Sequence, residues 1–257
     1  MFKAVLLDLD GTVYKGKSAI EGAKETIETL RENGVSIFYL TNASTKSRER
    51  RVDVIRKFGI GAEKGEIYSS AYAAAKYIAE NHPGKTVFEV GVGGIVDELE
   101  ERGIRLVADS SAGVVVVGLD RTLSYDKLAI ASKAIMDGAE FIAANEDATF
   151  PVEEGFMPGS GAVVAFVRTA TGKEPFILGK PNSYMIELVM EEHGFRKEDM
   201  VIVGDRLDTD ILAGKNAGIK TALVLTGVAT REDVEKLEKG KRPDYVLDSI
   251  KDVLTLP

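Results

Sequence analysis

Short apolar runs alternate with amphipathic segments from the beginning of the chain to its end. Runs of about 4–8 apolar residues predict buried strands, whereas apolar positions three and four residues apart predict helices that bury one face. The run at residues 4–7 is apolar at every position, as expected for a parallel strand that is covered on both faces. The strands predicted in this way cover residues 4–7, 35–40, 67–68, 86–90, 105–107, 113–117, 140–143, 176–178, 200–203, 221–225 and 245–246.

Amphipathic segments between these runs predict helices. The first of them places Ala23, Ile27 and Leu30 on one face and ends at Asn33-Gly34, a pair typical of helix C-termini. Because strands and helices alternate throughout, the pattern favours an α/β fold with a mainly parallel sheet. The predicted helices cover residues 20–32, 45–58, 70–81, 95–102, 125–137, 162–169, 184–192, 211–216 and 231–239.

The alternation is interrupted once, at His82-Pro83-Gly84, where a second series of strands and helices begins. A long irregular stretch at residues 145–160 belongs to this second series. The first series resumes with the strand at residues 176–178. We therefore expect a core domain made of residues 1–81 and 176–257, with residues 82–175 inserted as a second α/β domain.

Composition narrows the class of protein. The net charge of −8 argues against nucleic acid polymers and anionic membranes as partners. The absence of Cys excludes disulfides, thiolate catalysis and Cys-ligated zinc. No apolar stretch approaches the length of a transmembrane helix, and Asp8 interrupts the apolar run near the N-terminus before a signal-peptide pattern develops. We expect a cytoplasmic protein whose chemistry rests on carboxylates, Lys, Ser, Thr or Tyr.

Two carboxylates follow the first strand, in the sequence Asp8-Leu9-Asp10-Gly11-Thr12. Ligands of open α/β sheets bind at the carboxyl ends of strands, and two neighbouring carboxylates repel each other unless a cation or a shared proton separates them. Asp and Gly are also common in plain turns. On its own, this motif is as typical of a turn as of a functional site.

Polar residues also follow three other strands of the predicted core. They are Thr41-Asn42, Lys180, and Asp205 with Asp210. Since parallel strands point their carboxyl ends toward the same edge of the sheet, these groups can converge with Asp8 and Asp10. As isolated motifs, Thr41-Asn42 is also consistent with a helix cap and Lys180 with a surface loop.

The converging groups suit a phosphate ester as substrate. Carboxylates such as Asp8, Asp205 and Asp210 are the oxygen ligands that Mg2+ prefers. An Asp carboxylate can attack phosphorus, and a second carboxylic acid can protonate the leaving alcohol and then activate water. Thr41 and Asn42 offer a hydroxyl and backbone N–H groups for phosphoryl oxygens, and Lys180 offers a positive charge.

The complete set, in this order, resembles the haloacid dehalogenase (HAD)-like hydrolase superfamily. The insert between the Thr and Lys motifs resembles the type IIA cap of the NagD and para-nitrophenyl phosphatase-like subfamily. The resemblance implies a Rossmann-like parallel sheet core with an inserted α/β cap domain of that type. The motifs that carry it are Asp8-Leu9-Asp10-Gly11-Thr12, Leu40-Thr41-Asn42, Gly179-Lys180-Pro181-Asn182, Val116-Val117-Gly118-Leu119-Asp120 and Gly204-Asp205-Arg206-Leu207-Asp208-Thr209-Asp210.

The resemblance implies a role for each matching residue. Asp8 would be the nucleophile and a Mg2+ ligand, and Asp10 the general acid and base that also binds Mg2+ through its carbonyl. Lys180 would steady Asp8 and the phosphate. The remaining roles would be phosphoryl binding by Thr41 and Asn42, Mg2+ ligation by Asp205, support of the metal waters or of Lys180 by Asp210, and substrate contacts from the loop Arg206, Leu207, Asp208 and Thr209. Asp208 on its own is more typical of a helix cap or loop than of a metal ligand.

The insert carries weaker signals. Asn145 and Asp147 follow a predicted strand and Ser160 precedes a predicted helix, so these three are candidates for cap residues that select the substrate. Ordinary turn chemistry explains each of them equally well. Gly91-x-Gly93-Gly94 resembles a dinucleotide loop, but the last small residue of that fingerprint is missing, and we interpret the stretch as a turn between strand and helix.

The predicted activity is Mg2+-dependent hydrolysis of a small-molecule phosphate ester through an aspartyl-phosphate. Sugar phosphates, nucleotides, phosphoglycolate and pyridoxal phosphate all remain open as substrates. The alternatives are a phosphotransferase or mutase on the same scaffold, a phospho-Asp signalling switch, and an inactive binding protein. Caps of this type often pair, so a homodimer through the cap is a further expectation from the resemblance.

Overall fold

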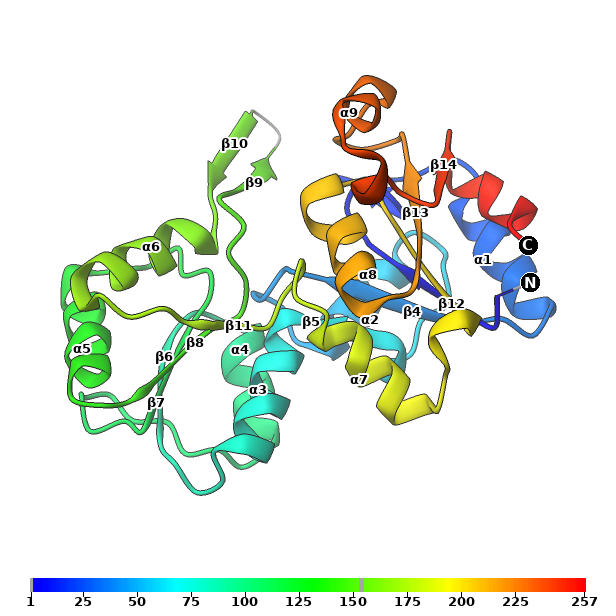
Figure 1. Ribbon diagram of the computed structural model, residues 1–257. Coiled ribbons are helices and arrows are strands. Elements are labelled where there is room, and N and C mark those ends of the chain that lie inside the picture. The colour runs from blue at the N-terminus through cyan, green and yellow to red at the C-terminus, as the bar shows by residue number, and fades with distance from the viewer. Residues whose placement is uncertain (1, 153–154) are drawn as a thin grey trace. The chain divides into compact units, whose positions relative to one another are not determined.

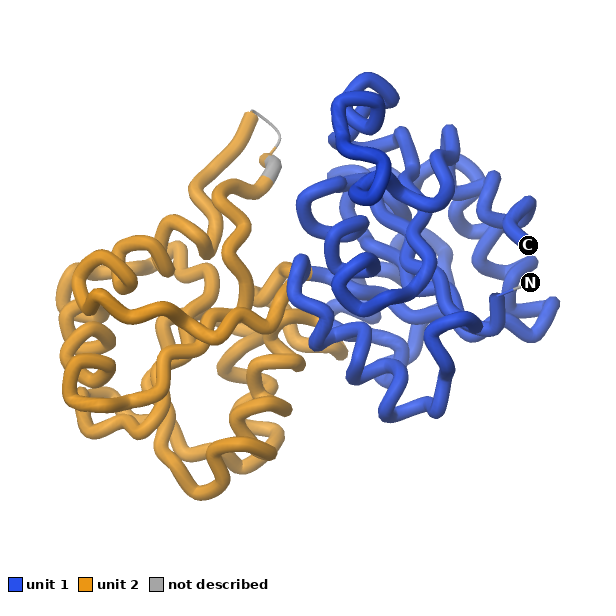
Figure 2. Tube along the Cα trace, viewed as in Figure 1, with its two compact units in different colours: residues 1–41, 51–68, 180–257 blue, residues 42–50, 69–179 orange. Residues whose placement is uncertain are grey.

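The computed structural model describes residues 2–152 and 155–257, and the chain forms two compact units (Figure 2). The first unit contains residues up to 41, 51–68 and 180–257. The second contains residues 42–50 and 69–179. Both units combine a parallel sheet with helices, so the predicted α/β class is confirmed.

The first unit is built on a six-stranded sheet in the order β14-β13-β12-β1-β4-β5 (Figure 1). β1 pairs in parallel with both β12 and β4, and Leu7 lies opposite Val203 on one side and Tyr39 on the other. The residues that follow these three strands therefore lie at one edge of the sheet. The strands are β1 (Ala4–Leu7), β4 (Ser36–Thr41), β5 (Ile67–Ser69), β12 (Met200–Gly204), β13 (Lys220–Val224) and β14 (Tyr245–Leu247).

Helices cover both faces of this sheet, which explains why its central strands are apolar at every position. On one face Val5 and Leu7 pack with Ile27 of α1 and Ile55 of α2. On the other face α8 packs so closely that a Cβ at Gly214 would lie 2.5 Å from Ile202 of β12. The helices are α1 (Ala23–Glu32), α2 (Arg48–Arg56), α7 (Tyr184–His193), α8 (Leu212–Ala217) and α9 (Arg231–Lys236), and a short hairpin joins β2 (Tyr14–Lys15) to β3 (Ser18–Ala19).

The second unit contains a four-stranded parallel sheet in the order β11-β8-β7-β6. Val115 and Val117 of β7 pack against α5 and α6 on one face of it. Its strands are β6 (Val87–Val90), β7 (Val114–Val117), β8 (Glu140–Ala143) and β11 (Phe176–Ile177). Its other elements are α3 (Ser70–Asn81), α4 (Gly94–Glu101), α5 (Tyr125–Met136), α6 (Ser160–Thr171) and an antiparallel pair, β9 (Thr149–Val152) and β10 (Gly155–Pro158).

The domain boundaries differ from those predicted at residues 82 and 175. α3 belongs to the second unit because it packs against α4, and β11 belongs there because it pairs with β8. A buried carboxylate, Glu98 of α4, accepts hydrogen bonds from Arg48 and Arg102. Both guanidinium groups lie over the ring of Tyr72 on α3, which ties the start of α2 to this unit.

Two local predictions were wrong. The strand expected at residues 105–107 is reduced to an isolated bridge between Leu106 and Val87. The stretch expected to be irregular contains the strands β9 and β10. The sequence does not show these strands as an alternation of apolar and polar residues, because Pro151 and Pro158 interrupt that pattern.

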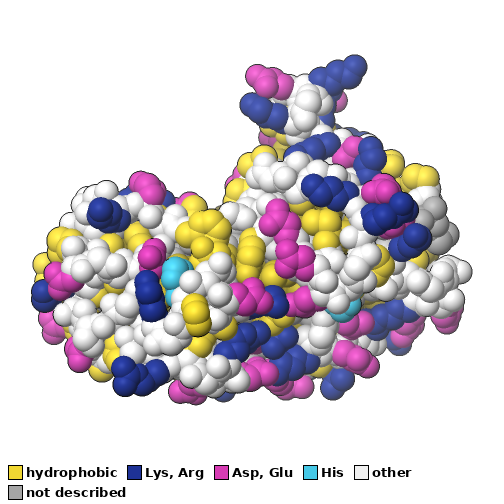
Figure 3. Space-filling view, turned by 60° about the horizontal axis from the view of Figure 1, so that its bottom comes forward, with side chains coloured by type: hydrophobic (Ala, Val, Ile, Leu, Met, Phe, Trp, Pro, Cys, Tyr) yellow, Lys and Arg dark blue, Asp and Glu magenta, His cyan; other side chains and the backbone are white. Residues whose placement is uncertain are grey.

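The surface carries both signs of charge. On the face shown in Figure 3, acidic and basic side chains are interspersed, and the basic ones do not gather into one broad patch. This mixture agrees with the net charge of −8. Within the described ranges, none of the helices combines the length and apolarity that a membrane span requires.

Asp244 links three elements at the edge of the first sheet. Its carboxylate accepts hydrogen bonds from Lys215 at 2.9 Å, from Lys220 at 2.9 Å, and from the backbone N–H and hydroxyl of Thr221 at 3.0 and 2.8 Å. Partial burial tends to raise the pKa of Asp244, but the two lysines and Thr221 together hold it well below its ordinary value.

We expect Asp244→Asn to lower the free energy of unfolding by about 1–2 kcal/mol at neutral pH, since solvent screens the lysine pairs and the Thr221 bonds contribute the larger part. Because the folded pKa is depressed, this stabilisation is present above the unfolded pKa of about 3.9 and disappears as the pH falls through the folded pKa. Urea unfolding of both proteins at several pH values measures it. Asp248→Asn, which removes an exposed pair with Arg231, is the matched control and should change little; an equal loss in both variants would contradict the account.

Candidate active site

The turn after β1 is shaped by its contact with Asp205. Asp8 continues the ladder of β1 by donating its N–H to the carbonyl of Val203 at 2.9 Å. Gly11 has φ +84°, and a Cβ there would lie 2.5 Å from Asp205 Oδ2. Only glycine accommodates both the positive φ and this close approach. The turn therefore brings the carboxyl end of β1 against that of β12.

Lys180 is a buried cation at this edge of the sheet. Its Nζ donates hydrogen bonds to Asp8 Oδ1 at 2.5 Å, to Asp210 Oδ1 at 2.6 Å and to the carbonyl of Leu40 at 3.2 Å. The side chain is 3% exposed. These three acceptors match the three donors of an ammonium group. Lys180 is therefore held between the carboxylate of Asp8, which precedes it in the sequence, and that of Asp210, which follows it.

Asp205 follows β12 and is held by the loop after β13. The N–H of Val228 donates to Asp205 Oδ2 at 2.8 Å, and the N–H of Ala229 donates to the Asp205 carbonyl at 3.1 Å. A Cβ at Gly227 would lie 1.9 Å from the same carboxylate oxygen, so the loop backbone encloses the carboxylate directly.

The segment after Asp205 contains two carboxylates, one exposed and one buried. Asp210 lies in a single π-helical turn (Leu207–Ile211), is buried, and accepts the N–H of Arg206 on Oδ2 at 3.1 Å. Asp208 is exposed and pairs with the Arg206 side chain at 2.7 Å. Of the four residues predicted to contact substrate, Thr209 is buried, Leu207 is partly buried, and Arg206 and Asp208 pair with each other.

Burial and repulsion disturb the ionisation of the acidic cluster. Burial raises the pKa of Asp8 well above its ordinary value against the attraction of Lys180, and Asp210 and Asp205 raise it further. Burial followed by repulsion from Asp210 raises the pKa of Asp205 to about 6. Burial alone would lower the pKa of Lys180, but Asp210 and Asp8 raise it above its ordinary value. With all three carboxylates ionised, the cluster would carry more negative charge than one ammonium group balances.

A divalent cation fits this cluster chemically. Oxygens of Asp8, Asp205 and Asp210 lie within 4.8 Å of one another, and all three side chains belong to the first unit. Carboxylate oxygens in such a group are the ligands that Mg2+ takes together with water. A bound cation would also relieve the repulsion that raises the pKa of Asp8 and Asp205.

Asp10 and Thr41 complete the first unit's share of the predicted site. Asp10 is exposed, unlike Asp8, and forms an isolated bridge with Tyr14. Burial and then the negative charge of Asp10 raise the pKa of Tyr14 to about 12. Thr41 is the last residue of β4 and is buried. Asp10 thus presents a solvent-accessible carboxyl group two residues after Asp8.

The other predicted residues belong to the second unit. Asn42, Asn145 and Ser160 are all buried, and Ser160 begins α6. The Asn145 side chain donates to the Asn42 carbonyl at 2.7 Å, and the Asn42 side chain donates to Asp147 at 3.2 Å. The structure therefore joins Asn42 to two residues that the sequence suggested only as candidates for substrate selection.

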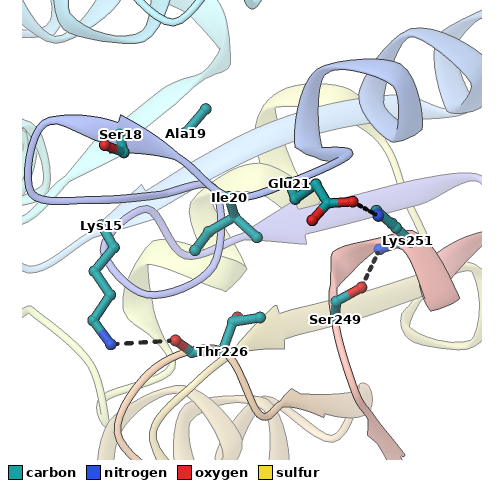
Figure 4. Close-up of a pocket in the computed structure, with 8 residues that line it drawn as sticks. All are labelled: Lys15, Ser18, Ala19, Ile20, Glu21, Thr226, Ser249 and Lys251. Atoms are coloured by element: carbon teal, nitrogen blue, oxygen red, sulfur yellow. Dashed lines mark hydrogen bonds and ion pairs between the residues drawn. The ribbon is translucent and has the colours of Figure 1, made fainter.

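Sequence reasoning missed the loop after β13. Thr226 Oγ1 donates to the Gly11 carbonyl at 2.6 Å, so this loop holds the turn after β1 as well as Asp205. Thr226 also lines an open cavity of about 480 Å³ (Figure 4), in which Lys15 points toward the Thr226 carbonyl and Lys251 pairs with Glu21. None of the predicted site residues lines it. The position of Thr226-Gly227 just after a strand was the available signal.

Comparison with known proteins places this geometry in a family. A model of haloacid dehalogenase-like hydrolases matches residues 5–105, and a HAD-hydrolase-like model matches residues 177–253. An acid sugar phosphatase of Staphylococcus saprophyticus is 40% identical over 253 residues, which are 98% of this chain and 97% of that protein. The chain therefore belongs to the haloacid dehalogenase-like hydrolase family.

Solved structures place the chain more closely within the family. NagD from Escherichia coli K-12 is 31% identical with a TM-score of 0.90, and each chain covers 98% of the other. A glycerol phosphate phosphatase of Mycobacterium tuberculosis, solved in complex with magnesium, is 34% identical with a TM-score of 0.91 over 98% of this chain and 76% of that one. The protein is thus an enzyme of the NagD and nitrophenylphosphatase-like branch, and its named relatives include phosphatases.

Proposed function

We propose that this enzyme is a Mg2+-dependent phosphatase that hydrolyses small-molecule phosphate monoesters through an aspartyl-phosphate on Asp8. The observation that carries the proposal is the buried bridge from Lys180 to Asp8 and Asp210 beside Asp205. A surface ion pair does not require three carboxylates close to one buried ammonium group, whereas phosphoryl transfer requires a nucleophile, a cation and a metal site together.

In the first step, a carboxylate oxygen of Asp8 attacks phosphorus and the bond between phosphorus and the ester oxygen breaks. Asp10 gives its proton to the departing alkoxide, so the alcohol leaves neutral. Lys180 keeps Asp8 oriented and offsets the negative charge that gathers on the phosphoryl oxygens. Thr41 and Asn42 bind those oxygens through their hydroxyl and backbone groups.

In the second step, the Asp10 carboxylate takes a proton from water, and the water oxygen attacks the phosphorus of the acyl phosphate. The bond between phosphorus and Asp8 breaks, which releases inorganic phosphate and restores the Asp8 carboxylate. The exposure of Asp10 supports this assignment, since a group that exchanges protons with water and substrate must be accessible. The second unit would then act as the cap that selects the substrate and excludes bulk water.

Asp8, Asp205 and the Asp10 carbonyl would hold Mg2+, with Asp210 supporting the site. When bound, the cation would neutralise charge on the carboxylates and on the phosphoryl group.

We expect Mg2+ to raise the melting temperature of the protein by about 5–10 °C at saturating concentration, since a ligand at 100 times its Kd adds about 2.7 kcal/mol to stability. Asp205→Asn should abolish this rise because it removes a ligand charge. Differential scanning fluorimetry with Mg2+ and with EDTA measures it. Asp208→Asn, which alters an exposed carboxylate three residues further on, should retain the full rise. A rise that persists in Asp205→Asn would contradict the metal assignment.

A panel of phosphate esters assayed with Mg2+ tests the function. The proposal predicts release of inorganic phosphate from small monoesters such as sugar phosphates, and no transfer to a second sugar or alcohol. A phosphotransferase or mutase would yield a phosphorylated acceptor, and a signalling switch would retain the phosphoryl group on Asp8 for minutes or longer. Failure to release phosphate from any ester would overturn the proposal. The phosphatases among its full-length relatives favour hydrolysis.

A further inference from the structure

Asn145 occupies a central place in the second unit, directly after β8 and Ala144. Its side chain is 3% exposed, and both ends of its amide are engaged. Nδ2 donates to the carbonyl of Asn42 at 2.7 Å, and Oδ1 accepts the N–H of Asp147 at 3.1 Å. A buried amide whose donor and acceptor groups are both hydrogen-bonded within the protein is poorly suited to recognising the shape of a substrate.

The same side chain also packs against a second segment that is distant in sequence. A Cβ at Gly179 would lie 2.8 Å from Asn145 Cβ, 2.6 Å from the carbonyl of Ala144 and 2.8 Å from Asn42 Oδ1. The backbone at Gly179 therefore lies directly against Asn145 and Asn42 with no room for a side chain. Asn145 thus contacts two segments, at Asn42 and at Gly179, that lie far apart in the sequence.

Each of these segments continues directly into a residue of the proposed phosphoryl site. Asn42 follows Thr41, and Gly179 precedes Lys180. Asn42 shares one planar peptide unit with Thr41, and Gly179 shares one with Lys180, so a shift of either backbone changes where the Cα of Thr41 or of Lys180 can lie. The position of Asn145 therefore affects two proposed phosphate-binding residues, Thr41 and Lys180.

Neighbouring residues hold this arrangement in place. Ser70 Oγ donates to the same Asn42 carbonyl at 2.6 Å, so that this oxygen accepts two side-chain hydrogen bonds. The Asn42 side chain donates to Asp147 at 3.2 Å. Gly161 in turn donates its N–H to the Asp147 carbonyl at 2.9 Å. Asn42 is thus fixed through its backbone and its side chain.

We propose that Asn145 is a positioning residue for phosphoryl transfer, which sets Thr41 and Lys180 through its contacts with Asn42 and Gly179. This inference rests on the proposed function. It replaces the expectation that Asn145 selects the substrate, because a positioning residue affects the phosphoryl group common to all substrates and a selecting residue affects the part that differs between them.

The test compares Asn145→Ala with wild type on three phosphate monoesters with different alcohol groups. Loss of one buried hydrogen bond at this place should lower kcat/KM about tenfold for every ester, with the ranking of the esters unchanged. The inhibition constant of inorganic phosphate should rise by a similar factor. In a Thr41→Val background, where the hydroxyl is already absent, the same substitution should cost less than about threefold.

Two matched variants separate positioning from folding. Asn145→Asp keeps the acceptor for Asp147 but places a carboxylate oxygen against the Asn42 carbonyl, so it should lower kcat/KM more than Asn145→Ala does. Ser70→Ala removes the other donor to that carbonyl and should lower kcat/KM about threefold to tenfold with the same pattern across esters. Ser70→Ala serves as the test if Asn145→Ala does not fold.

Three results would overturn the inference. One is a change in the ranking of the esters, which would make Asn145 a selecting residue. Another is kcat/KM within twofold of wild type in a folded variant, which would make its role structural. The third is full additivity with Thr41→Val. Absence of phosphatase activity in the wild-type enzyme would instead count against the proposed function, so the two failures are distinguishable.

Discussion

Asp8→Asn is expected to lower kcat for every phosphate ester by about 10⁴-fold or more, because an amide oxygen does not form the acyl phosphate through which both steps pass. Asn has nearly the same size as Asp and can still accept the hydrogen bond that Lys180 donates at 2.5 Å. The fold should therefore survive. Steady-state phosphate release with Mg2+ measures the effect.

Asp248→Asn is the control for Asp8→Asn, since it makes the same chemical change at an exposed carboxylate that lies outside the predicted site and pairs with Arg231. It should remain within a few-fold of wild type. Circular dichroism and thermal melting should show that both variants are folded. Activity of Asp8→Asn within tenfold of wild type would remove Asp8 from the role of nucleophile.

Lys180→Met is expected to lower kcat about 10³-fold and, without Mg2+, to lower the free energy of unfolding by about 3–5 kcal/mol. The reason is that Lys180 is the shared partner of Asp8 and Asp210 in a buried place, so its loss leaves two carboxylates facing each other. Urea unfolding in EDTA measures stability, and phosphate release measures activity.

Lys180→Arg separates charge from geometry in this prediction. The guanidinium group restores the positive charge but does not reproduce three hydrogen bonds from one nitrogen to Asp8, Asp210 and the Leu40 carbonyl. We expect it to recover more of the stability than of the activity. A Lys180→Met variant as stable as wild type and nearly as active would show that the bridge contributes to neither.

The convergence of the site could be predicted because it follows from the direction of strands. Asp8, Thr41 and Asp205 each stand at or just after the end of an apolar run, and parallel pairing of β1 with β4 and β12 brings those ends to one edge. The apolar pattern of these strands is strong because both faces are covered. Lys180 was predicted as the polar residue after the strand at residues 176–178, but that strand, β11, pairs with β8 of the second unit. The structure nevertheless places Lys180 Nζ beside Asp8, 172 residues away in sequence.

The division into units was harder to predict because an amphipathic helix does not reveal which sheet it packs on. α3 packs on α4. The Tyr72 ring of α3 lies against the guanidinium groups of Arg48 and Arg102. Both of these groups donate to the buried Glu98 of α4. Likewise, nothing in the sequence of the two-residue strand β11 indicates that it pairs with β8. The sheet on which a helix packs, and the strand with which another strand pairs, depend on tertiary contacts, which the periodicity of the sequence does not encode.

Contacts from side chains to backbone atoms could also not be predicted from the sequence. The bonds from Asn145 to the Asn42 carbonyl and from Thr226 to the Gly11 carbonyl end on groups that every residue possesses. An acceptor of that kind leaves no pattern of side chains to recognise. This is why Asn145 was a candidate only by its position after a strand, and why Thr226 was missed.

The central claim is that Asp8 becomes covalently phosphorylated during turnover. The direct measurement is to quench the enzyme with acid during its first turnover of a phosphate ester, reduce the acyl phosphate with borohydride, and locate the product by mass spectrometry. We expect conversion of residue 8 to homoserine in wild type and none in Asp8→Asn. Turnover of the ester with no modification at residue 8, or with modification of another carboxylate, would contradict it.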